Sequence, residues 1–308
     1  MQAPKNSLSS RLARNFRRYK YIYIMAIPVV IYYLIFMYWP MYGAQIAFKQ
    51  FSPGKGILGS PWIGLKNFEK FFRSFYLTRL LRNTLLISFY GLLFSFPAPI
   101  ILALLLNELR SNKFKRCVQT ISYLPHFISV MVICGMIIDF TRSDGLINDI
   151  IAFFGGTRKT MLLDPGLFRP IYIISDIWQG VGWGSIIYLS ALTGIDPEQY
   201  EAAVIDGAGR LQKILYITLP GIAPTIVIML IMRMGQMMNV GYEKIILLYN
   251  GNTYETADVI SSFVYRKGLV EADYGYSTAI GLFNSIVNLL LLLITNTISR
   301  KVGETSLW

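Results

Sequence analysis

The sequence predicts an all-α polytopic membrane protein, a bundle of six transmembrane helices. Of its 308 residues, 54% are hydrophobic and only 15% are charged, whereas a soluble domain carries roughly 25% charged residues. The mean hydropathy of +0.47 points the same way. The third observation is a set of apolar runs of about 20 residues, the length that a helix needs to cross the hydrocarbon core. The predicted spans are 21–44, 84–106, 118–139, 171–193, 222–242 and 277–298.

The first element is a basic segment, residues 1–20, which contains several lysines and arginines and no acid. The apolar run 21–44 follows it. This run is too long for the apolar region of a signal peptide, and it lacks a clear small-residue cleavage site. We therefore expect it to be a retained first span that places the basic segment in the cytoplasm.

The connecting segments are expected to alternate between the two sides of the membrane. The short, basic segment 107–117 fits a cytoplasmic loop, and Arg300 and Lys301 place the tail 300–308 on the same side. The loops expected outside are 45–83, 140–170 and 243–276. Loop 45–83 also carries many basic residues, which a strict positive-inside count does not predict. Pro97 and Pro99 fall inside the second span, where neighbouring helices are expected to satisfy the freed backbone groups.

The composition excludes several classes of function. The formal net charge of +12 would suit a nucleic acid or anionic lipid, but cytoplasmic anchoring to membrane lipids explains it in an integral membrane protein, so no nucleic-acid partner is expected. Cys117, Cys134 and the single His126 do not have the spacing of a metal site or a catalytic group. The sequence has no Gly-rich phosphate-binding loop ending in Gly-Lys-Ser/Thr. We expect no catalytic residue, no metal and no bound ATP on this chain.

The polar segment 196–220 separates the fourth and fifth apolar runs. Asp196 can cap a helix, and Pro197 suits its first position. Gly207 allows backbone angles that other residues resist, so the helix should end or turn there. Pro220 then marks the entry to the next helix. The prediction is a short amphipathic helix between two membrane spans.

This segment resembles the EAA signature of the membrane subunits of binding-protein-dependent ABC importers. The matching residues are Glu201-Ala202-Ala203, then Gly207, then Ile217-x-Leu219-Pro220, at the spacing of that family. The Asp206-Gly207-Ala208 core looks like the branch that imports sugars and oligosaccharides. The resemblance covers the number and order of segments from about residue 21 to residue 299.

The resemblance implies that the segment is a cytoplasmic coupling helix, which enters a cleft of a separate ATP-binding subunit. It assigns that contact to Glu201, Ala202, Ala203, Asp206 and Gly207. ATP and Mg²⁺ would bind to two such partner subunits. The other implied partners are an extracellular solute-binding protein and a second, homologous membrane subunit, expected to be a different chain.

Polar residues inside the spans are candidates for a substrate path. Arg233 lies in the fifth span with Gln236 and Asn239 close to it. A charge in the centre of a membrane costs about 2.5–3.5 kcal/mol on insertion scales, and such residues usually face a cavity. Arg233 could alternatively pair with an acid on a neighbouring subunit.

The fourth span contains Trp178, Gln179 and Trp183 between glycines. By resemblance to the sugar importers, aromatic rings and amides on this span could contact a sugar in the path. The alternatives are that the two tryptophans are interfacial anchors and that Gln179 and Asn239 bond between helices.

Taken together, the residues and the resemblance predict the permease subunit of an ATP-driven importer in the cell membrane. We expect it to carry a carbohydrate by alternating access, as an oligosaccharide that Arg233 would suit if it is acidic. An importer of amino acids, peptides or ions would share the EAA segment. An ATP-independent channel or scaffold would have no ATPase partner.

Overall fold

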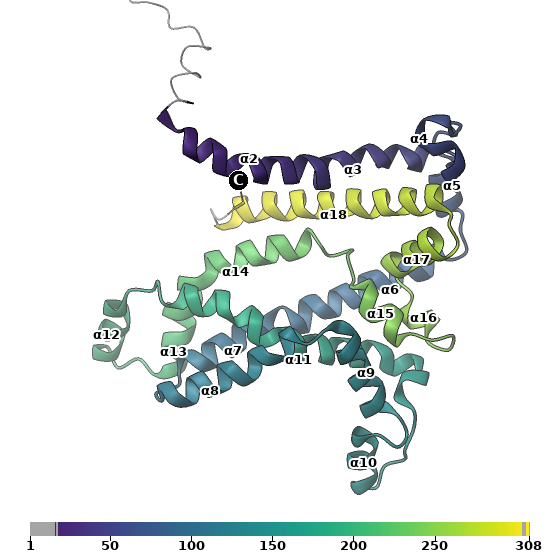
Figure 1. Ribbon diagram of the computed structural model, residues 1–308. Helices are drawn as coiled ribbons and strands as arrows, with labels where there is room; N and C mark the ends of the chain where they lie inside the picture. Colours follow the sequence, from purple (N-terminus) through teal and green to yellow (C-terminus); the bar gives the residue numbers. More distant parts are fainter. Residues whose placement is uncertain (1–15, 17, 304–305, 308) are drawn as a thin grey trace, which may run out of the picture.

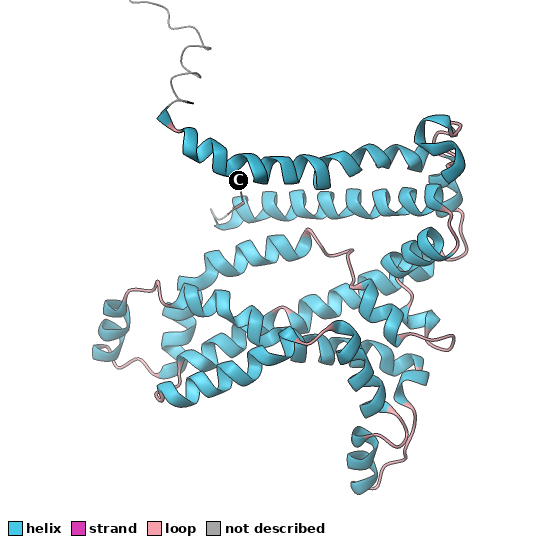
Figure 2. Ribbon diagram, in the orientation of Figure 1, coloured by secondary structure: helices cyan, strands magenta, loops and turns pink. Residues whose placement is uncertain are grey.

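The computed structural model describes residue 16, residues 18–303 and residues 306–307. Most of the predicted basic segment 1–20, and part of the tail 300–308, lie outside the described residues. The described chain is helical, and its one β-type contact is an isolated antiparallel bridge between Lys49 and Trp62 (Figures 1 and 2). The predicted all-α class is confirmed.

Four helices in the described part of the chain are long and apolar enough to cross a membrane. The first is Lys20–Phe48, which contains α2 (Lys20–Tyr33) and α3 (Trp39–Met41), and the second is Leu77–Asn107, which contains α6 (Leu77–Tyr90) and α7 (Pro97–Asn107). The third is Arg210–Met234, which contains α13 (Arg210–Lys213) and α14 (Leu219–Met234). The fourth, Tyr274–Lys301, lies within α18 (Tyr274–Gly303). A bent pair of helices raises the number of candidate spans to five.

The predicted third span, 118–139, is wrong as a continuous helix. The segment Asn112–Phe127, which contains α8 (Asn112–Tyr123), meets the segment Val130–Phe153 at 101°. The second segment comprises α9 (Val130–Thr141) and α10 (Leu146–Phe153). Pro125 lacks a backbone N–H, and Ser129 caps the new helix by accepting a hydrogen bond from the N–H of Val132. Together these residues end one helix and begin another.

The predicted fourth span corresponds to α11 (Pro165–Leu192), which is a continuous helix. The side chain of Asp164, immediately before it, caps its first turn by accepting a hydrogen bond from the N–H of Gly166. The predicted fifth span, 222–242, is wrong at its outer end, because α14 stops at Met234 and residues 235–241 are not helical. The remaining helices are shorter. They are α4 (Gly56–Gly59), α5 (Lys66–Phe72), α12 (Pro197–Ile205), α15 (Tyr242–Leu248), α16 (Tyr254–Ala257) and α17 (Ile260–Tyr265).

Three of the long helices pass through a proline by widening one turn. The residue before each proline donates its N–H to the carbonyl five positions back, in place of the usual four. The pairs are Trp39 to Leu34, Phe96 to Gly91 and Leu219 to Ile214, before Pro40, Pro97 and Pro220. A proline ring clashes with the carbonyl four residues earlier, and a wide turn at that place relieves the clash. The helices therefore stay continuous without help from a neighbour.

The long helices run side by side, with α2, α18 and α14 stacked in that order and α11 beside α7 and α8 below them (Figure 1). The helix α12, the start of α2 and the end of α18 lie at one end, and α4, α5, α16 and α17 lie at the other. A close approach fixes α11 against α8. A Cβ atom on Gly182 would lie 2.0 Å from the carbonyl oxygen of Ser122, so only glycine allows this contact.

The helix α2 contributes nothing to the core of this chain. Its side chains are exposed along its whole length, although they are almost all apolar. An apolar face of this size on a membrane helix needs lipid or another subunit beside it. The helix is therefore a surface for contacts outside the chain.

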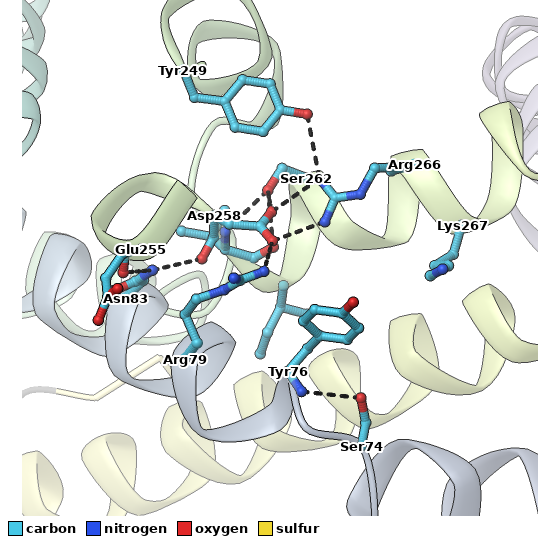
Figure 3. A network of polar contacts seen from close by, with 12 residues as sticks. Ser74, Tyr76, Arg79, Asn83, Tyr249, Glu255, Asp258, Ser262, Arg266 and Lys267 are labelled. Atoms are coloured by element: carbon cyan, nitrogen blue, oxygen red, sulfur yellow. Dashed lines mark hydrogen bonds and ion pairs between the residues drawn. The ribbon is translucent and has the colours of Figure 1, made fainter. Parts of the chain in front are cut away.

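A buried ion cluster ties together the end of the bundle opposite α12 (Figure 3). The Asp258 carboxylate is 0% exposed and lies 3.0 Å from Nη2 of Arg79 and 2.8 Å from Nη2 of Arg266. The Ser262 hydroxyl donates to the same carboxylate at 2.9 Å. Burial disfavours the charged guanidinium of Arg266, but the hydrogen bonds and charge of Asp258 outweigh it and raise its pKa. The cluster joins α6 to α17.

We expect Asp258→Asn to destabilise the protein by about 3 kcal/mol, because it leaves two arginines facing a neutral amide in a largely buried place. Asp273→Asn is the matched control. It removes an exposed ion pair with Lys70, and such pairs contribute at most about 1 kcal/mol. Melting temperatures in detergent measure both effects, and equal losses for the two variants would contradict the role given to the cluster.

Candidate functional site

The EAA segment forms a helix that protrudes from the bundle at one end (Figure 1). Asp196 caps it by accepting a hydrogen bond from the N–H of Glu198 at 3.0 Å, and Pro197 is its first residue. After the helix, Gly207 has a φ of 76°, in the region that glycine occupies without strain. The predicted cap and turn are therefore both present.

The surface of α12 is free of contacts over most of its length. Glu201 and Ala202 are exposed, Ala203 is half-buried, and the apolar Val204 and Ile205 are 59% and 86% exposed. The Tyr200 hydroxyl lies 3.0 Å from Oγ1 of the buried Thr218. This hydrogen bond joins α12 to the base of the long helix that ends in α14. Asp206 and Gly207 are exposed at the turn. The arrangement can pass a movement of α12 directly into that helix.

Arg233 lies in the last turn of α14, immediately before the chain leaves the helix at residue 235. A Cβ atom on Gly91 would lie 3.0 Å from Nη2 of Arg233. Gly91 belongs to the wide turn between α6 and α7, so the absence of a side chain there makes room for the guanidinium. Among the described residues, Arg233 forms no ion pair.

Two cavities meet at Arg233. One has a volume of about 140 Å³ and is lined by Ser88, Tyr172 and Asn239, among other residues. The other has a volume of about 330 Å³ and extends along α11 towards Tyr188. Asp176, Arg233 and Gln236 line both cavities. These three residues therefore form the wall between two compartments that follow each other along the bundle.

Asp176 was not among the residues predicted for the path. It is an acid within the predicted span 171–193, and the rule that singled out Arg233 applies to it equally. Asp176 and Arg233 share both cavities, yet no ion pair joins them in the described structure. The wall holds one negative and one positive charge, and neither is neutralised by a direct contact.

Amide side chains fix the non-helical segment 235–241 that follows α14. The Nδ2 atoms of Asn284 and Asn288 donate to Oδ1 of Asn239 at 2.7 and 3.1 Å. Oδ1 of Asn288 accepts a hydrogen bond from the N–H of Met238 at 2.8 Å. Asn239 thus lines a cavity and also bonds between helices, the alternative given for it above. These bonds satisfy the N–H of Met238 and Oδ1 of Asn239 where the helix is interrupted, whereas Oδ1 of Asn284 is buried without a hydrogen-bond partner among the described residues.

The residues predicted on the fourth span lie elsewhere on α11. Trp178 lines a separate, apolar cavity of about 460 Å³ on another face of the helix. Trp183 stacks on His126, with ring centroids 4.5 Å apart. Gln179 is half-buried and is not among the residues that line the two cavities at Arg233. The structure brings Arg233, Gln236 and Asn239 together and leaves these three outside that group. Contact of any of the six with a substrate stays a prediction.

The chain is similar to known proteins over most of its length. Residues 95–304 match the family described as "Binding-protein-dependent transport system inner membrane component". The chain is 44% identical to the polygalacturonan/rhamnogalacturonan transport system permease protein YteP of Bacillus subtilis, over 99% of this chain and 95% of the relative. It is also 44% identical to protein LplB of the same organism, over 95% of this chain and 92% of the relative.

Two solved structures are similar over nearly the whole chain. One is a chain of a bacterial ABC transporter involved in the import of the acidic polysaccharide alginate, with 46% identity, a TM-score of 0.88, and coverage of 95% of this chain and 99% of that chain. The other is a chain of a bacterial alginate ABC transporter in complex with a periplasmic protein that holds an alginate pentasaccharide. It has 45% identity and a TM-score of 0.89, and the match covers 96% of this chain and 100% of that chain.

Proposed function

The chain belongs to the family of binding-protein-dependent transport system inner membrane components, and from this premise we propose that it carries acidic oligosaccharides across the cell membrane. As a permease subunit of an ABC importer, it is a multi-pass inner-membrane protein, and ATP is hydrolysed on separate ATPase subunits. An ATP-independent channel or scaffold is therefore set aside, and the permease needs no cofactor of its own.

The observation that supports an acidic substrate is the guanidinium of Arg233, which lies in the wall between the two cavities and forms no ion pair with any described residue. A carboxylate on a sugar ring would form charge-assisted hydrogen bonds with it. Gln236 and Asn239 offer amide groups to hydroxyls beside it. The similar proteins support this substrate class, since polygalacturonan and alginate, the polymers for which they are named, are both rich in carboxylates.

We propose six spans for this chain, with the bent pair as the third and α11 as the fourth. Both termini and α12 would then lie in the cytoplasm. The start of α2, the end of α18 and α12 lie at the same end of the bundle (Figure 1), which supports this proposal. The loops 45–83, 140–170 and 243–276 would face a solute-binding protein. The exposed α2 and the open side of the cavities would face a second, homologous permease subunit.

Alternating access follows from this arrangement. Asp176, Arg233 and Gln236 would separate an outer from an inner compartment. The ATPase subunits would move α12 through Glu201, Ala202 and Ala203, and the hydrogen bond from Tyr200 to Thr218 would carry this movement into the helix that bears Arg233. A rocking of the two permease subunits about this midplane site would then open the compartments in turn.

The test is the ATPase activity of the complete importer in lipid nanodiscs, assembled with its second permease, its ATPase subunits and its solute-binding protein. We expect oligogalacturonate to stimulate ATP hydrolysis only when the binding protein is present. Neutral malto-oligosaccharides, amino acids and peptides should leave the basal rate unchanged. Stimulation by an amino acid or peptide would favour the alternative importer class, and stimulation by neutral sugars alone would contradict an acidic substrate.

A further inference from the structure

Arg169 lies near the start of α11, at the end of the bundle opposite α12, and its charge is held by neutral groups alone. Its Nη2 donates to Oδ1 of Asn83 at 2.8 Å, and its Nε donates to the carbonyl of Thr256 at 3.2 Å. No ion pair forms on it within the described residues. A partly buried cation held only by neutral groups is stabilised when an anion arrives.

Arg169 differs in this respect from two other arginines at the same end of the bundle. Arg79 and Arg266 share the buried carboxylate of Asp258, and Asn83 donates its amide hydrogens to the carbonyls of Glu255 and Asp258. Asn83 is therefore held in place with its oxygen turned to Arg169. A guanidinium has five N–H donors, and Nη1 of Arg169 donates to no acceptor in the described structure. The group is fixed in position but still has donors to offer.

Arg169 lines a groove that lies next to the two cavities at Arg233. The groove has a volume of about 430 Å³ and is lined by Arg169, the rings of Tyr90 and Phe94, and isoleucines of α11. Ile173 also lines the smaller cavity at Arg233, and Ile177 also lines the larger one. The groove and the two cavities are thus neighbours on the same side of α11. Seven residues separate Arg169 from Asp176, which is about 10 Å along a helix.

We propose that Arg169 determines specificity at the outer mouth of the path, by binding a carboxylate of the oligosaccharide before that carboxylate reaches Arg233. The inference rests on the proposed function. Arg169 and Arg233 would then be two successive cationic positions along the path. The rings of Tyr90 and Phe94 line the same groove as Arg169. An anionic lipid headgroup would satisfy the same guanidinium. The groove shares Ile173 and Ile177 with the cavities at Arg233, and this proximity favours the substrate.

The test is direct binding of tri-galacturonate to the permease–ATPase complex in nanodiscs without the solute-binding protein, compared with the methyl ester of the same sugar. We expect Arg169→Gln to weaken binding of the acid roughly tenfold or more, the loss expected for one hydrogen bond to a charged group. Binding of the ester should not change. Arg169→Lys should restore part of the affinity for the acid, and Arg79→Gln is the matched control that removes another arginine from the same end.

Equal losses for the acid and the ester would make Arg169 a structural anchor only, and so would an equal effect of Arg79→Gln on the acid. An effect that appears only in nanodiscs with anionic lipid would assign the site to a headgroup. Each of these results overturns the inference, as does an absence of binding to the unaltered complex. The proposed function fails separately, if oligogalacturonate does not stimulate the complete importer.

Discussion

Glu201→Lys is expected to reduce ATP hydrolysis by the assembled importer to its basal rate, even with substrate and binding protein present. Glu201 is exposed on α12, on a helix that contacts the rest of the chain mainly through Tyr200. Its carboxylate is therefore available for charge-assisted hydrogen bonds to the ATPase subunit. Reversing the charge replaces that attraction with repulsion at the same point. The amount of protein in the membrane should not change, because no intramolecular contact is lost.

Glu108→Lys provides the control for this variant. Glu108 is also an exposed acid in a loop of the same end of the bundle, but it lies outside α12, so its reversal should leave the stimulated rate intact. Gly207→Pro tests the same contact by another route, because a proline cannot adopt the positive φ of this position. A stimulated rate that survives both Glu201→Lys and Gly207→Pro would exclude α12 from the coupling.

Arg233→Gln is expected to raise the KM for uptake of acidic oligosaccharides by roughly one to two orders of magnitude. Removing a hydrogen bond to a charged group costs about 1.5–3 kcal/mol, which corresponds to roughly a 10- to 150-fold loss in affinity. Arg233 has no intramolecular ion pair in the described structure, so the variant loses little folding energy. Initial rates of uptake into proteoliposomes measure the effect.

Asp176→Asn should act in the opposite direction. Asp176 lines the same wall as Arg233, and its negative charge opposes the passage of an anion. Its neutralisation should therefore lower the KM for the acidic substrate or leave it unchanged. If Arg233→Gln and Asp176→Asn reduced uptake to the same extent, the two residues would have a joint structural role, and the assignment of Arg233 to the substrate would be wrong.

The helix α12 could be predicted closely from the sequence, because its signals are local. The cap at Asp196, the proline at position 197 and the turn at Gly207 each depend on neighbours in the chain, and each is present. The long apolar helices could be placed for the same reason, since length and hydropathy alone define them. The widened turns before the prolines were not predicted. Help from neighbouring helices was expected at Pro97, and the structure shows a local solution instead.

The interruptions of the helices depend on contacts between distant segments and could not be read from hydropathy. The break after Met234 is held by Asn239, in the non-helical segment itself, and by Asn284 and Asn288 of the distant helix α18. The choice of face on α11 has the same cause. The sequence contains both Asp176 and Trp178, and only the packing of α6, α7 and α14 against α11 decides which of them faces the cavities at Arg233.

The most direct test of the account is the accessibility of α12 to a membrane-impermeant maleimide. The variant Val204→Cys would be made in a Cys117→Ser background, because Cys117 is exposed and Cys134 is buried. We predict labelling in inside-out vesicles and none in intact cells, with protection when the ATPase subunits are bound. A cysteine in place of the exposed Phe153 of α10 should show the reverse pattern. Labelling of position 204 from outside the cell, or no protection by the ATPase, would contradict the account.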